Sequence, residues 1–298
     1  MKILLFGKTG QVGREVLRAL PADFDLVICD RGGADLRRPE SVAAIVAREA
    51  ADVVVNAAAY TDVDRAESEP EEAMLVNATA VAAMADAVAN SGGWLVHYST
   101  DYVFDGTKGD RYTEADRPNP LSIYGATKLE AERLVAASGC RHLIFRTSWV
   151  YAAHGRNFPR TILRLARERD ALDVVDDQIG CPTSAAWLAR HTLAAIRRCV
   201  DPTTAPPSGI YHACPIGETT WHAYARFLVA EARRRGAGLR LAADAIRPIL
   251  TSAYPTPARR PLDSRLDSSK LAATFALPLP TWQEDVLTTL DEMLAHAP

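Results

Sequence analysis

Short apolar runs alternate with longer amphipathic segments along the first half of the chain. Each apolar run ends at a glycine or a polar residue, as a buried strand does when it reaches a loop. The segments between the runs carry apolar residues three or four positions apart, which is the spacing of a helix that covers a core. We expect strands at 3–6, 26–29, 53–55, 95–98 and 143–145, and helices at 11–20, 40–50, 71–90 and 128–137.

This alternation predicts an α/β protein. A parallel sheet that is covered by helices on both faces has strands that are apolar throughout, rather than alternately apolar and polar. Crossovers between such strands are nearly always right-handed. The sequence therefore predicts a doubly wound parallel sheet of the Rossmann type over residues 1–180.

The pattern becomes less regular in residues 181–298. Helices are expected at 184–198, 222–235 and 282–294, and a strand at 210–213. Residues 201–209 are rich in proline and threonine, which is typical of a turn-rich linker. We expect this part to form a smaller α/β lobe that binds substrate, interleaved with the main domain and resting on the C-terminal edge of its sheet.

Composition excludes several classes of protein. The 298 residues are 48% hydrophobic and 24% charged, which is typical of a folded globular chain. The net charge of −3 has no basic stripe and speaks against a nucleic-acid partner. Five cysteines without C-x-x-C spacing predict reduced thiols rather than disulfides or a zinc site. With no long apolar stretch and no leader at the N-terminus, we expect a cytoplasmic protein without a membrane partner.

The segment GKTGQVG follows the first expected strand and opens the first expected helix. In a dinucleotide-binding turn, Gly7 would allow the tight turn, Gly10 the approach of a pyrophosphate, and Gly13 the packing of helix on sheet. Asp30 ends the second strand, where a carboxylate can bind the adenosine ribose of NAD. Arg31 beside it would suit the 2′-phosphate of NADP, so both cofactors remain open.

Tyr124 and Lys128 are four residues apart at the start of an expected helix, so they share one face. A lysine cation near a tyrosine lowers the pKa of the phenol and favours acid–base catalysis. Thr100 follows the fourth strand, at the sheet edge where α/β proteins bind ligands. We therefore predict a catalytic group of these three residues.

Seven segments give the chain a resemblance that covers nearly its whole length. They resemble the extended short-chain dehydrogenase/reductase superfamily and, more narrowly, its dTDP-4-dehydrorhamnose reductase family. The resemblance implies reduction of the C4 ketone of dTDP-4-dehydro-β-L-rhamnose by NADPH or NADH, the last step of dTDP-L-rhamnose synthesis. The segments are GKTGQVG, NAAAYTDVDRAESEP, HYSTDYVFDG, YGATKLEAE, FRTSWVY, DQIGCPT and YPTPARRPLDSRLD.

The resemblance also implies roles for individual residues. Tyr124 would be the catalytic acid, with Lys128 and Thr100 as its partners. The cofactor would lie against Gly7, Gly10, Gln11, Val12, Gly13, Asp30, Asp35, Leu36, Ala57, Ala58, Ala59, Tyr98, Tyr124 and Lys128. The deoxysugar would contact Thr100, Asp101 and Trp149, and the diphosphate Asn157, Arg259 and Arg260, since an arginine fork can bind two phosphate oxygens.

Some members of this family are described as dimers that hold a magnesium ion between glutamates of both subunits. Glu15 is present here, and Glu292 is a candidate for a second ligand. The remaining position is Ala186, which removes a carboxylate that a hard cation would need. We therefore expect no metal, and either a monomer or a homodimer.

Two alternatives remain. One is a nucleotide-sugar epimerase or dehydratase on the same scaffold. Dehydratases of that type usually carry a further acidic residue after the active-site aspartate, whereas Asp101 is followed here by Tyr102. The other is a non-catalytic regulatory subunit like that of methionine adenosyltransferase. The intact glycine loop and the complete set of Thr100, Tyr124 and Lys128 argue against this alternative.

Overall fold

A parallel six-stranded sheet forms the centre of the computed structural model, which describes residues 1–30, 32–201, 203 and 205–295. The strand order is β10-β5-β4-β3-β1-β2, and every neighbouring pair is parallel. This confirms the predicted α/β fold. The strands are β1 (Lys2–Phe6), β2 (Asp25–Cys29), β3 (Val53–Asn56), β4 (Trp94–Thr100), β5 (Arg141–Thr147) and β10 (Gly209–His212).

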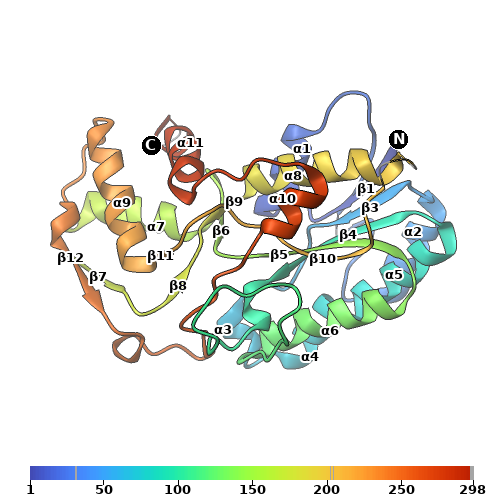
Figure 1. Cartoon of the computed structure of the whole chain (residues 1–298), viewed down its shortest axis with the longest axis horizontal. Helices are drawn as coiled ribbons and strands as arrows, with labels where there is room; N and C mark the ends of the chain where they lie inside the picture. The colour runs from blue at the N-terminus through green and yellow to red at the C-terminus, as the bar shows by residue number, and fades with distance from the viewer. Residues whose placement is uncertain (31, 202, 204, 296–298) are drawn as a thin grey trace.

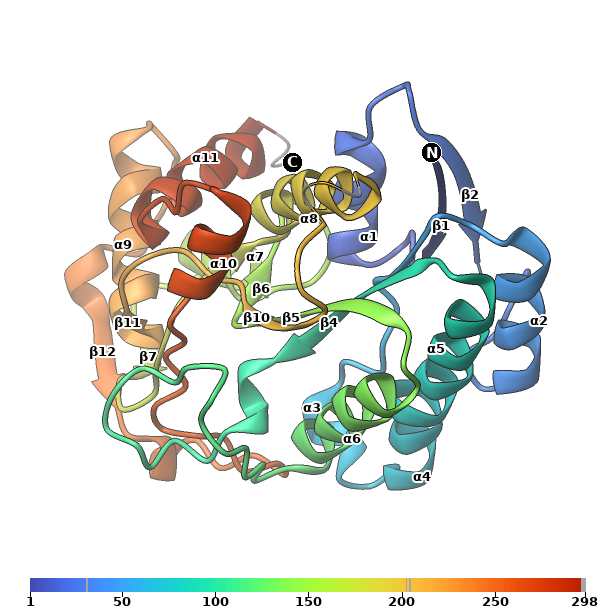
Figure 2. The same ribbon diagram turned by 45° about the vertical axis from the view of Figure 1, so that its right-hand side comes forward.

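Helices cover both faces of this sheet (Figure 2). One layer, above the sheet in that view, contains α1 (Gln11–Ala19) and α8 (Ala185–Val200). The other contains α2 (Pro39–Glu49), α5 (Ala80–Ser91) and α6 (Ile123–Ala137). Two separate apolar cores lie between the sheet and these layers, which explains why the central strands are apolar throughout.

The order of the strands reverses beside β1. From β1 the chain first adds β2 on one side and then adds β3, β4, β5 and β10 on the other. In open α/β sheets, ligands bind at such a reversal, outside the carboxyl ends of the strands. Here those ends are Phe6 of β1 and Asn56 of β3, so the glycine loop lies at the expected binding position.

A smaller lobe, on the left in Figure 1, has its own apolar core. Its short strands pair as β7 with β12, β8 with β11 and β6 with β9. The elements are β6 (Val150–Tyr151), α7 (Phe158–Glu168), β7 (Leu172–Val175), β8 (Ile179–Gly180), β9 (Thr183–Ser184), β11 (Thr219–Thr220), α9 (Trp221–Arg234), η3 (Ala243–Ala245), β12 (Ile246–Ile249), η4 (Thr251–Ala253) and α11 (Trp282–Ala295).

The lobe and the main sheet alternate along the chain. Helix α7 and strand β7 precede residue 180 but belong to the lobe, whereas α8, β10 and α10 (Ser269–Phe275) follow it and pack with the main sheet. A boundary at residue 180 is therefore only approximate.

The helix predicted at 71–90 consists of α4 (Pro70–Met74), a π-helical turn η1 (Leu75–Thr79) and α5. Within the described ranges, Pro70–Ser91 is the one helix long and apolar enough to cross a membrane by length and composition, and 56% of its most apolar window is buried. It packs against α2 and α6, as a core helix does. Two short elements complete the fold, α3 (Val63–Ala66) and η2 (Asp101–Val103).

Candidate active site

The glycine loop connects β1 to α1 and depends on two of its three glycines. Gly7 has φ +85°, and a Cβ there would lie 2.5 Å from the carbonyl carbon of Ala57. A Cβ on Gly13 would lie 2.1 Å from the carbonyl oxygen of Gly7. A Cβ on Gly10 would lie 3.4 Å from its nearest neighbour, an ordinary contact. Gly10 is also the N-cap of α1 and offers no side chain to its free N–H groups, which leaves room for a phosphate.

These contacts predict different results for two matched substitutions. We expect Gly10→Ala to keep the melting temperature of the protein, because its methyl group makes only ordinary contacts with the loop. We expect it to weaken dinucleotide binding by about tenfold or more, because the methyl group stands at the N-terminus of α1, where the backbone has to approach the pyrophosphate. Gly13→Ala forces α1 away from the loop, so we expect it to lower both the melting temperature and dinucleotide affinity. Thermal unfolding and calorimetric titration with NADPH measure the two effects. Equal melting temperatures for the two variants would contradict this assignment.

Asp30 lies just beyond β2 and is held from two sides. Its Oδ1 accepts hydrogen bonds from the backbone N–H groups of Gly32 (3.1 Å) and Gly33 (3.2 Å), and its Oδ2 lies 3.0 Å from Nζ of Lys8. The hydrogen bond from Lys8 is the main reason why the pKa of Asp30 is lowered. Lys8 therefore places a cation beside the expected ribose site. Sequence analysis did not single out this residue. Arg31 lies outside the described residues.

The other residues expected to line the cofactor groove follow the strand ends. Ala57, Ala58 and Ala59 continue from β3 and are half-buried, and the N–H of Ala57 donates to the carbonyl oxygen of Phe6 (3.1 Å). Tyr98 shares a 2.7 Å hydrogen bond with Thr192 of α8.

Of the remaining groove candidates, Leu36 is buried in the core on the α2 side, and Val12 packs on the opposite core. Asp35 accepts a hydrogen bond from the backbone N–H of Arg37 (3.0 Å).

Gln11 links the glycine loop to the lobe. Its Nε2 donates to the carbonyl oxygen of Val150 (3.4 Å), and its Oε1 accepts from Nδ2 of Asn157 (2.8 Å). Asn157 is the N-cap of α7, since its Oδ1 accepts from the N–H of Arg160 (3.2 Å). The amide of Asn157 is thus bonded to the protein at both its nitrogen and its oxygen.

Thr100 and Tyr124 meet where β4 ends and α6 begins. The Thr100 hydroxyl caps η2 by accepting from the N–H of Tyr102 (3.2 Å). Ser122 caps α6 by accepting from the N–H of Gly125 (3.2 Å), which places Tyr124 in the first turn. A Cβ on Gly125 would lie 2.2 Å from the carbonyl oxygen of Tyr102, so this glycine lets α6 begin directly against η2.

The predicted lowering of the tyrosine pKa is wrong. Burial and, to a smaller extent, the carboxyl of Asp101 raise the pKa of Tyr124 to about 12, although the hydroxyl of Thr100 acts in the opposite direction. Lys128 is 2% exposed, and its amine binds Nε2 of His97 (3.0 Å) and the carbonyl oxygen of Tyr98 (2.5 Å). Burial lowers the pKa of Lys128 to about 8. At neutral pH the phenol of Tyr124 therefore keeps its proton.

Asp101 is buried beside this pair. Its Oδ1 accepts from the hydroxyl of Thr100 (3.0 Å), and its Oδ2 is buried without a hydrogen-bond partner in the described part of the chain. Burial raises the pKa of Asp101 to about 7. A buried polar atom of this kind needs a partner, and a ligand hydroxyl can supply one.

Trp149 has a strained backbone, with φ +46°, which is unusual for a bulky residue. Its ring stacks on Trp221 of the lobe, with centroids 3.5 Å apart and planes at 11°. A Cβ on Gly180 would lie 2.6 Å from the Trp149 ring, so only glycine fits there. The strain and the stack hold the indole between the main sheet and the lobe.

The two arginines near the C-terminus differ. Arg260 binds both carboxylate oxygens of Asp64 (3.0 and 2.7 Å), which ties this segment to α3. Arg259 is exposed, and its side chain has no ion-pair partner among the residues described. Both line a cavity of about 210 Å³, together with Thr251, Tyr254, Pro255, Thr256 and Ala258.

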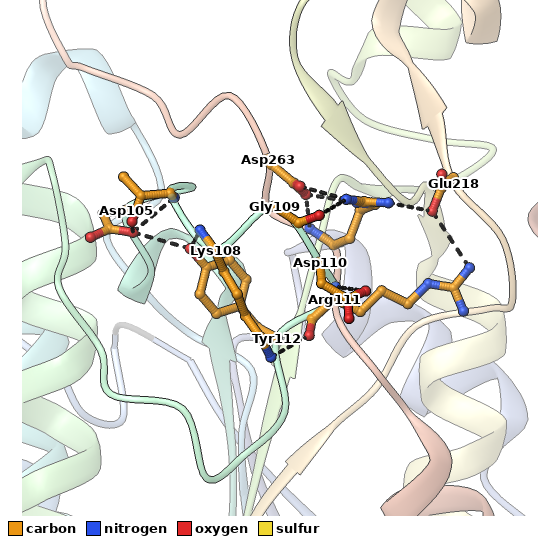
Figure 3. A network of polar contacts seen from close by, with 10 residues as sticks. Asp105, Lys108, Gly109, Asp110, Arg111, Tyr112, Glu218 and Asp263 are labelled. Atoms are coloured by element: carbon orange, nitrogen blue, oxygen red, sulfur yellow. Dashed lines mark hydrogen bonds and ion pairs between the residues drawn. The ribbon is translucent and has the colours of Figure 1, made fainter.

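The loop that follows η2 is fixed to the lobe by a polar network (Figure 3). Arg265 donates to both carboxylate oxygens of Asp263 (2.8 and 2.7 Å) and to Glu218 (2.9 Å). The hydroxyl of Tyr112 donates to Asp105 (3.1 Å), and the N–H of Tyr112 donates to the carbonyl oxygen of Arg265 (2.7 Å). This network connects the catalytic edge of the sheet to the lobe.

Three features thus lie toward the carboxyl edge of the main sheet. They are the glycine loop, Tyr124 near Thr100, and the lobe with its aromatic and arginine side chains. The family model of the RmlD substrate binding domain matches residues 1–295. The chain belongs to this family. A dTDP-4-dehydrorhamnose reductase of Shigella flexneri is 50% identical over 297 residues, which cover 98% of each chain. Another from Burkholderia thailandensis is 47% identical over 298 residues, 99% of this chain and 100% of the relative.

Solved structures of similar proteins support the same family and the same fold. The crystal structure of a dTDP-4-dehydrorhamnose reductase from Bacillus anthracis in complex with NADP is 30% identical, with a TM-score of 0.88 over 99% of both chains. A UDP-glucose 4-epimerase of Thermus thermophilus in complex with NAD has a TM-score of 0.79 at 19% identity, which shows a shared fold alone. The predicted resemblance is thus confirmed at the level of the RmlD family.

The residues at the magnesium site that the resemblance suggested, Glu15, Glu292 and Ala186, make other contacts in this structure. The carboxylates of Glu15 and Glu292 both pair with Arg18, and Glu15 also lies 3.0 Å from Nε2 of His154. Ala186, the third position, lies on α8. In the described ranges no three His, Cys, Asp or Glu side chains lie together where they could hold a metal ion.

Proposed function

We propose that this chain reduces the C4 ketone of dTDP-4-dehydro-β-L-rhamnose to dTDP-β-L-rhamnose with NADPH or NADH. One observation carries the proposal. Tyr124, whose raised pKa keeps its proton in place at neutral pH, stands in the first turn of α6 at the carboxyl edge of the sheet, the edge at which Thr100 ends β4 and the glycine loop follows β1. The relatives at 50% and 47% identity, which the chain matches nearly end to end, carry the name of this reaction.

The residues divide the work of a ketone reduction. The reduced nicotinamide, when bound, supplies the hydride to C4. Tyr124 donates its phenolic proton to the carbonyl oxygen as negative charge develops there. The Thr100 hydroxyl is placed to hydrogen-bond the same oxygen, which orients it and stabilises that charge. Lys128, one turn along α6 from Tyr124, directs its amine to His97 and to the carbonyl oxygen of Tyr98 on β4.

The cofactor site fits the glycine loop. The N-terminus of α1 has no side-chain cap, and Gly10 leaves space for a pyrophosphate against its N–H groups. The carboxylate of Asp30 is oriented by Gly32, Gly33 and Lys8 at the position where a ribose hydroxyl is bound in such folds. We propose that both reduced cofactors bind, since Lys8 places a cation where Asp30 alone would repel a 2′-phosphate.

Asp30→Asn tests the cofactor assignment. The carboxylate favours NADH by accepting from its ribose hydroxyls and disfavours NADPH by repulsion. We expect the ratio of kcat/KM for NADPH over NADH to rise by about tenfold, which is the usual effect of one charged hydrogen bond. Steady-state kinetics with each cofactor measures the ratio. An unchanged ratio would mean that the ribose does not bind at Asp30.

The substrate would lie between the sheet edge and the lobe. Asp101 offers a buried, unpartnered oxygen to a sugar hydroxyl, and Trp149 presents its indole on the Trp221 stack. Arg259 is the better arginine for the diphosphate, because Arg260 is already bound to Asp64. Asn157, whose amide is committed to Gln11 and to the cap of α7, remains a weaker candidate.

The proposal is tested by mixing the purified protein with dTDP-4-dehydro-L-rhamnose, generated from dTDP-glucose by the preceding enzymes, and reduced cofactor. We expect loss of absorbance at the reduced-nicotinamide band and formation of dTDP-L-rhamnose, with NADPH and NADH compared in parallel. An arm that contains a magnesium chelator tests the expectation that no metal is needed. No oxidation with either cofactor would overturn the sugar assignment.

We also propose a cytoplasmic location, supported by five buried cysteines that are all free. Whether the protein is a monomer or a homodimer is settled by sedimentation of the purified chain.

A further inference from the structure

Two buried thiols lie where the lobe meets the main sheet. Cys181 stands between β8 and β9 of the lobe and is 2% exposed, and Cys214 follows β10 of the main sheet and is 1% exposed. Both side chains belong to the apolar core of the lobe. Sγ of Cys181 lies 3.4 Å from the carbonyl oxygen of Pro215, the residue after Cys214. The two cysteines are therefore neighbours, although they are far apart along the chain.

Each of the two thiols is the largest influence on the pKa of the other. The thiol of Cys181 is the main reason why the pKa of Cys214 is lowered, and Ser268, whose Oγ lies 3.3 Å from Sγ of Cys214, acts in the same direction. The thiol of Cys214 and burial raise the pKa of Cys181 well above its usual value. Cys214 therefore loses its proton first, and the thiolate is the reactive form of a cysteine.

The other three cysteines lack this arrangement. Burial raises the pKa of Cys29, Cys140 and Cys199, and in the described part of the chain no second thiol acts on any of them. A buried thiol in such surroundings is inert. Cys181 and Cys214 thus differ from the other cysteines in having each other as a partner.

A cavity of about 220 Å³ lies next to the two thiols. Three of its lining residues also contact the sulfur atoms. The carbonyl oxygen of Pro215 lies near Cys181, and the carbonyl oxygen of Leu266 and Oγ of Ser268 lie 3.7 and 3.3 Å from Sγ of Cys214. Ile216, which also lines the cavity, is 48% exposed, so the cavity reaches the surface. A water molecule needs about 10–15 Å³ of such space, so a molecule as small as hydrogen peroxide fits beside the thiols.

We propose that Cys181 and Cys214 form a redox pair, which hydrogen peroxide oxidises to a disulfide between the lobe and the main sheet. The inference goes beyond the proposed reduction and does not depend on it. It adds a modification site at a distance from the glycine loop, formed by two side chains to which the ketone reduction gives no role.

The oxidation takes place in two steps. The thiolate of Cys214 attacks one oxygen of the peroxide, and the O–O bond breaks, which leaves a sulfenic acid and a hydroxide that takes up a proton to become water. Sγ of Cys181 then attacks Sγ of Cys214, and the S–O bond breaks, so that the hydroxyl group leaves with the thiol proton as a second water. The two cysteines lose two electrons, and these reduce the peroxide.

The disulfide would join two segments that hold the ligand edge. The carbonyl oxygen of Cys181 accepts from the hydroxyl of Ser148 (2.7 Å), which precedes Trp149. The N–H of Ala213, which precedes Cys214, donates to a carbonyl oxygen of β5 (2.7 Å). The cross-link would therefore tie the segment that supports Trp149 directly to the main sheet.

Peptide mass spectrometry of the full-length protein tests the proposal. The reduced protein is treated with hydrogen peroxide, its remaining thiols are alkylated, and it is digested with trypsin without a reducing agent. We expect a cross-link between the peptides that contain Cys181 and Cys214, lighter than their sum by two hydrogens, and we expect dithiothreitol to remove it. The absence of a cross-link in the folded protein, or cross-links that involve all five cysteines alike, would overturn the proposal.

Cys214→Ser and Cys199→Ser are matched variants for this experiment. Trypsin leaves Cys199 and Cys214 in one peptide, residues 199–226, so the mass of the cross-link alone does not tell which of the two is bonded. We expect Cys214→Ser to abolish the cross-link and Cys199→Ser to keep it at the level of the parent. A cross-link that survives in Cys214→Ser would overturn the proposal. Thermal unfolding verifies that each variant is folded.

Dimedone, which reacts with sulfenic acids, tests the order of the two steps. In Cys181→Ser the sulfenic acid of Cys214 has no neighbouring thiol to attack it, so we expect dimedone to trap it. In Cys214→Ser we expect about tenfold less label at Cys181, because the pKa of a buried thiol without a partner is raised. Equal labelling of the two variants would contradict the assignment of Cys214 as the attacking thiol. None of these measurements uses turnover, so their outcome is independent of the reductase activity.

Discussion

Tyr124→Phe is expected to lower kcat for reduction of dTDP-4-dehydrorhamnose by about 10²- to 10⁴-fold, the usual contribution of a positioned general acid. The ring remains, and only the proton donor is lost. Because burial raises the pKa of Tyr124 to about 12, the phenol is protonated throughout the neutral pH range. KM for the sugar and affinity for the cofactor are expected to change little, since the lost proton acts only as the bond forms.

Tyr112→Phe is the matched control for this variant. It also removes one hydroxyl from a buried tyrosine, but this hydroxyl donates to Asp105 in the loop network and not to the catalytic edge (Figure 3). We expect its kcat to stay within about a few-fold of the parent. If Tyr124→Phe kept near-normal turnover, the proton that reaches the carbonyl oxygen would have to come from another group.

Glu132→Ala is expected to give the largest loss of stability, about 3–5 kcal/mol of the free energy of unfolding. Glu132 and Arg146 are each 2% exposed, and the carboxylate accepts two hydrogen bonds from the guanidinium and one from Ser99. Removing the acid leaves a buried guanidinium without its counter-charge. Urea unfolding followed by circular dichroism measures the difference.

Glu168→Ala provides the comparison on the surface. Glu168 and Arg164 form a pair on α7 through both carboxylate oxygens, but their side chains are 53% and 59% exposed. Water screens such a pair, so we expect a loss of no more than about 1 kcal/mol. If Glu132→Ala and Glu168→Ala lowered the free energy of unfolding by similar amounts, burial would not be what makes the Glu132–Arg146 pair important for stability.

The sheet and the ligand-binding edge could be predicted from sequence because their determinants are local. Strands such as Val53–Asn56 are apolar throughout because helices cover both faces, and Gly7 and Gly13 stand where a Cβ would collide with backbone. The order of Thr100, Tyr124 and Lys128 along the chain also predicted the end of a strand and the start of a helix.

Contacts between distant segments could not be predicted in this way. The pKa of Tyr124 was expected to fall because Lys128 is one helical turn away, but the amine binds His97 and Tyr98 instead. His97 itself lies in an apolar strand and gave no signal, because its hydrogen-bond partner, Asn56, lies on a neighbouring strand. Pairing across strands is set by the fold and not by local spacing.

Helix α7 was missed for a different reason. It begins at Phe158 after an N-cap, Asn157, and a proline follows at the second helical position, which is a recognisable start signal. Its buried residues Ile162, Leu163 and Ala166 also lie on one helix face, opposite Arg160, Arg164 and Arg167, so this amphipathic pattern is a second local signal from which the helix could have been predicted. The bond from Asn157 to Gln11, which joins this helix to the glycine loop, is again a contact between distant segments.

The most direct test of this direct reduction uses reduced cofactor in which both hydrogens at C4 of the nicotinamide are replaced by deuterium. The protein is incubated with dTDP-4-dehydro-L-rhamnose, and the product is analysed by proton magnetic resonance. We expect dTDP-L-rhamnose with deuterium at C4 of the sugar, formed by the parent and, at a rate lower by about 10²- to 10⁴-fold, by Tyr124→Phe. Deuterium at another carbon, or unlabelled product from labelled cofactor, would contradict a direct reduction of the C4 ketone.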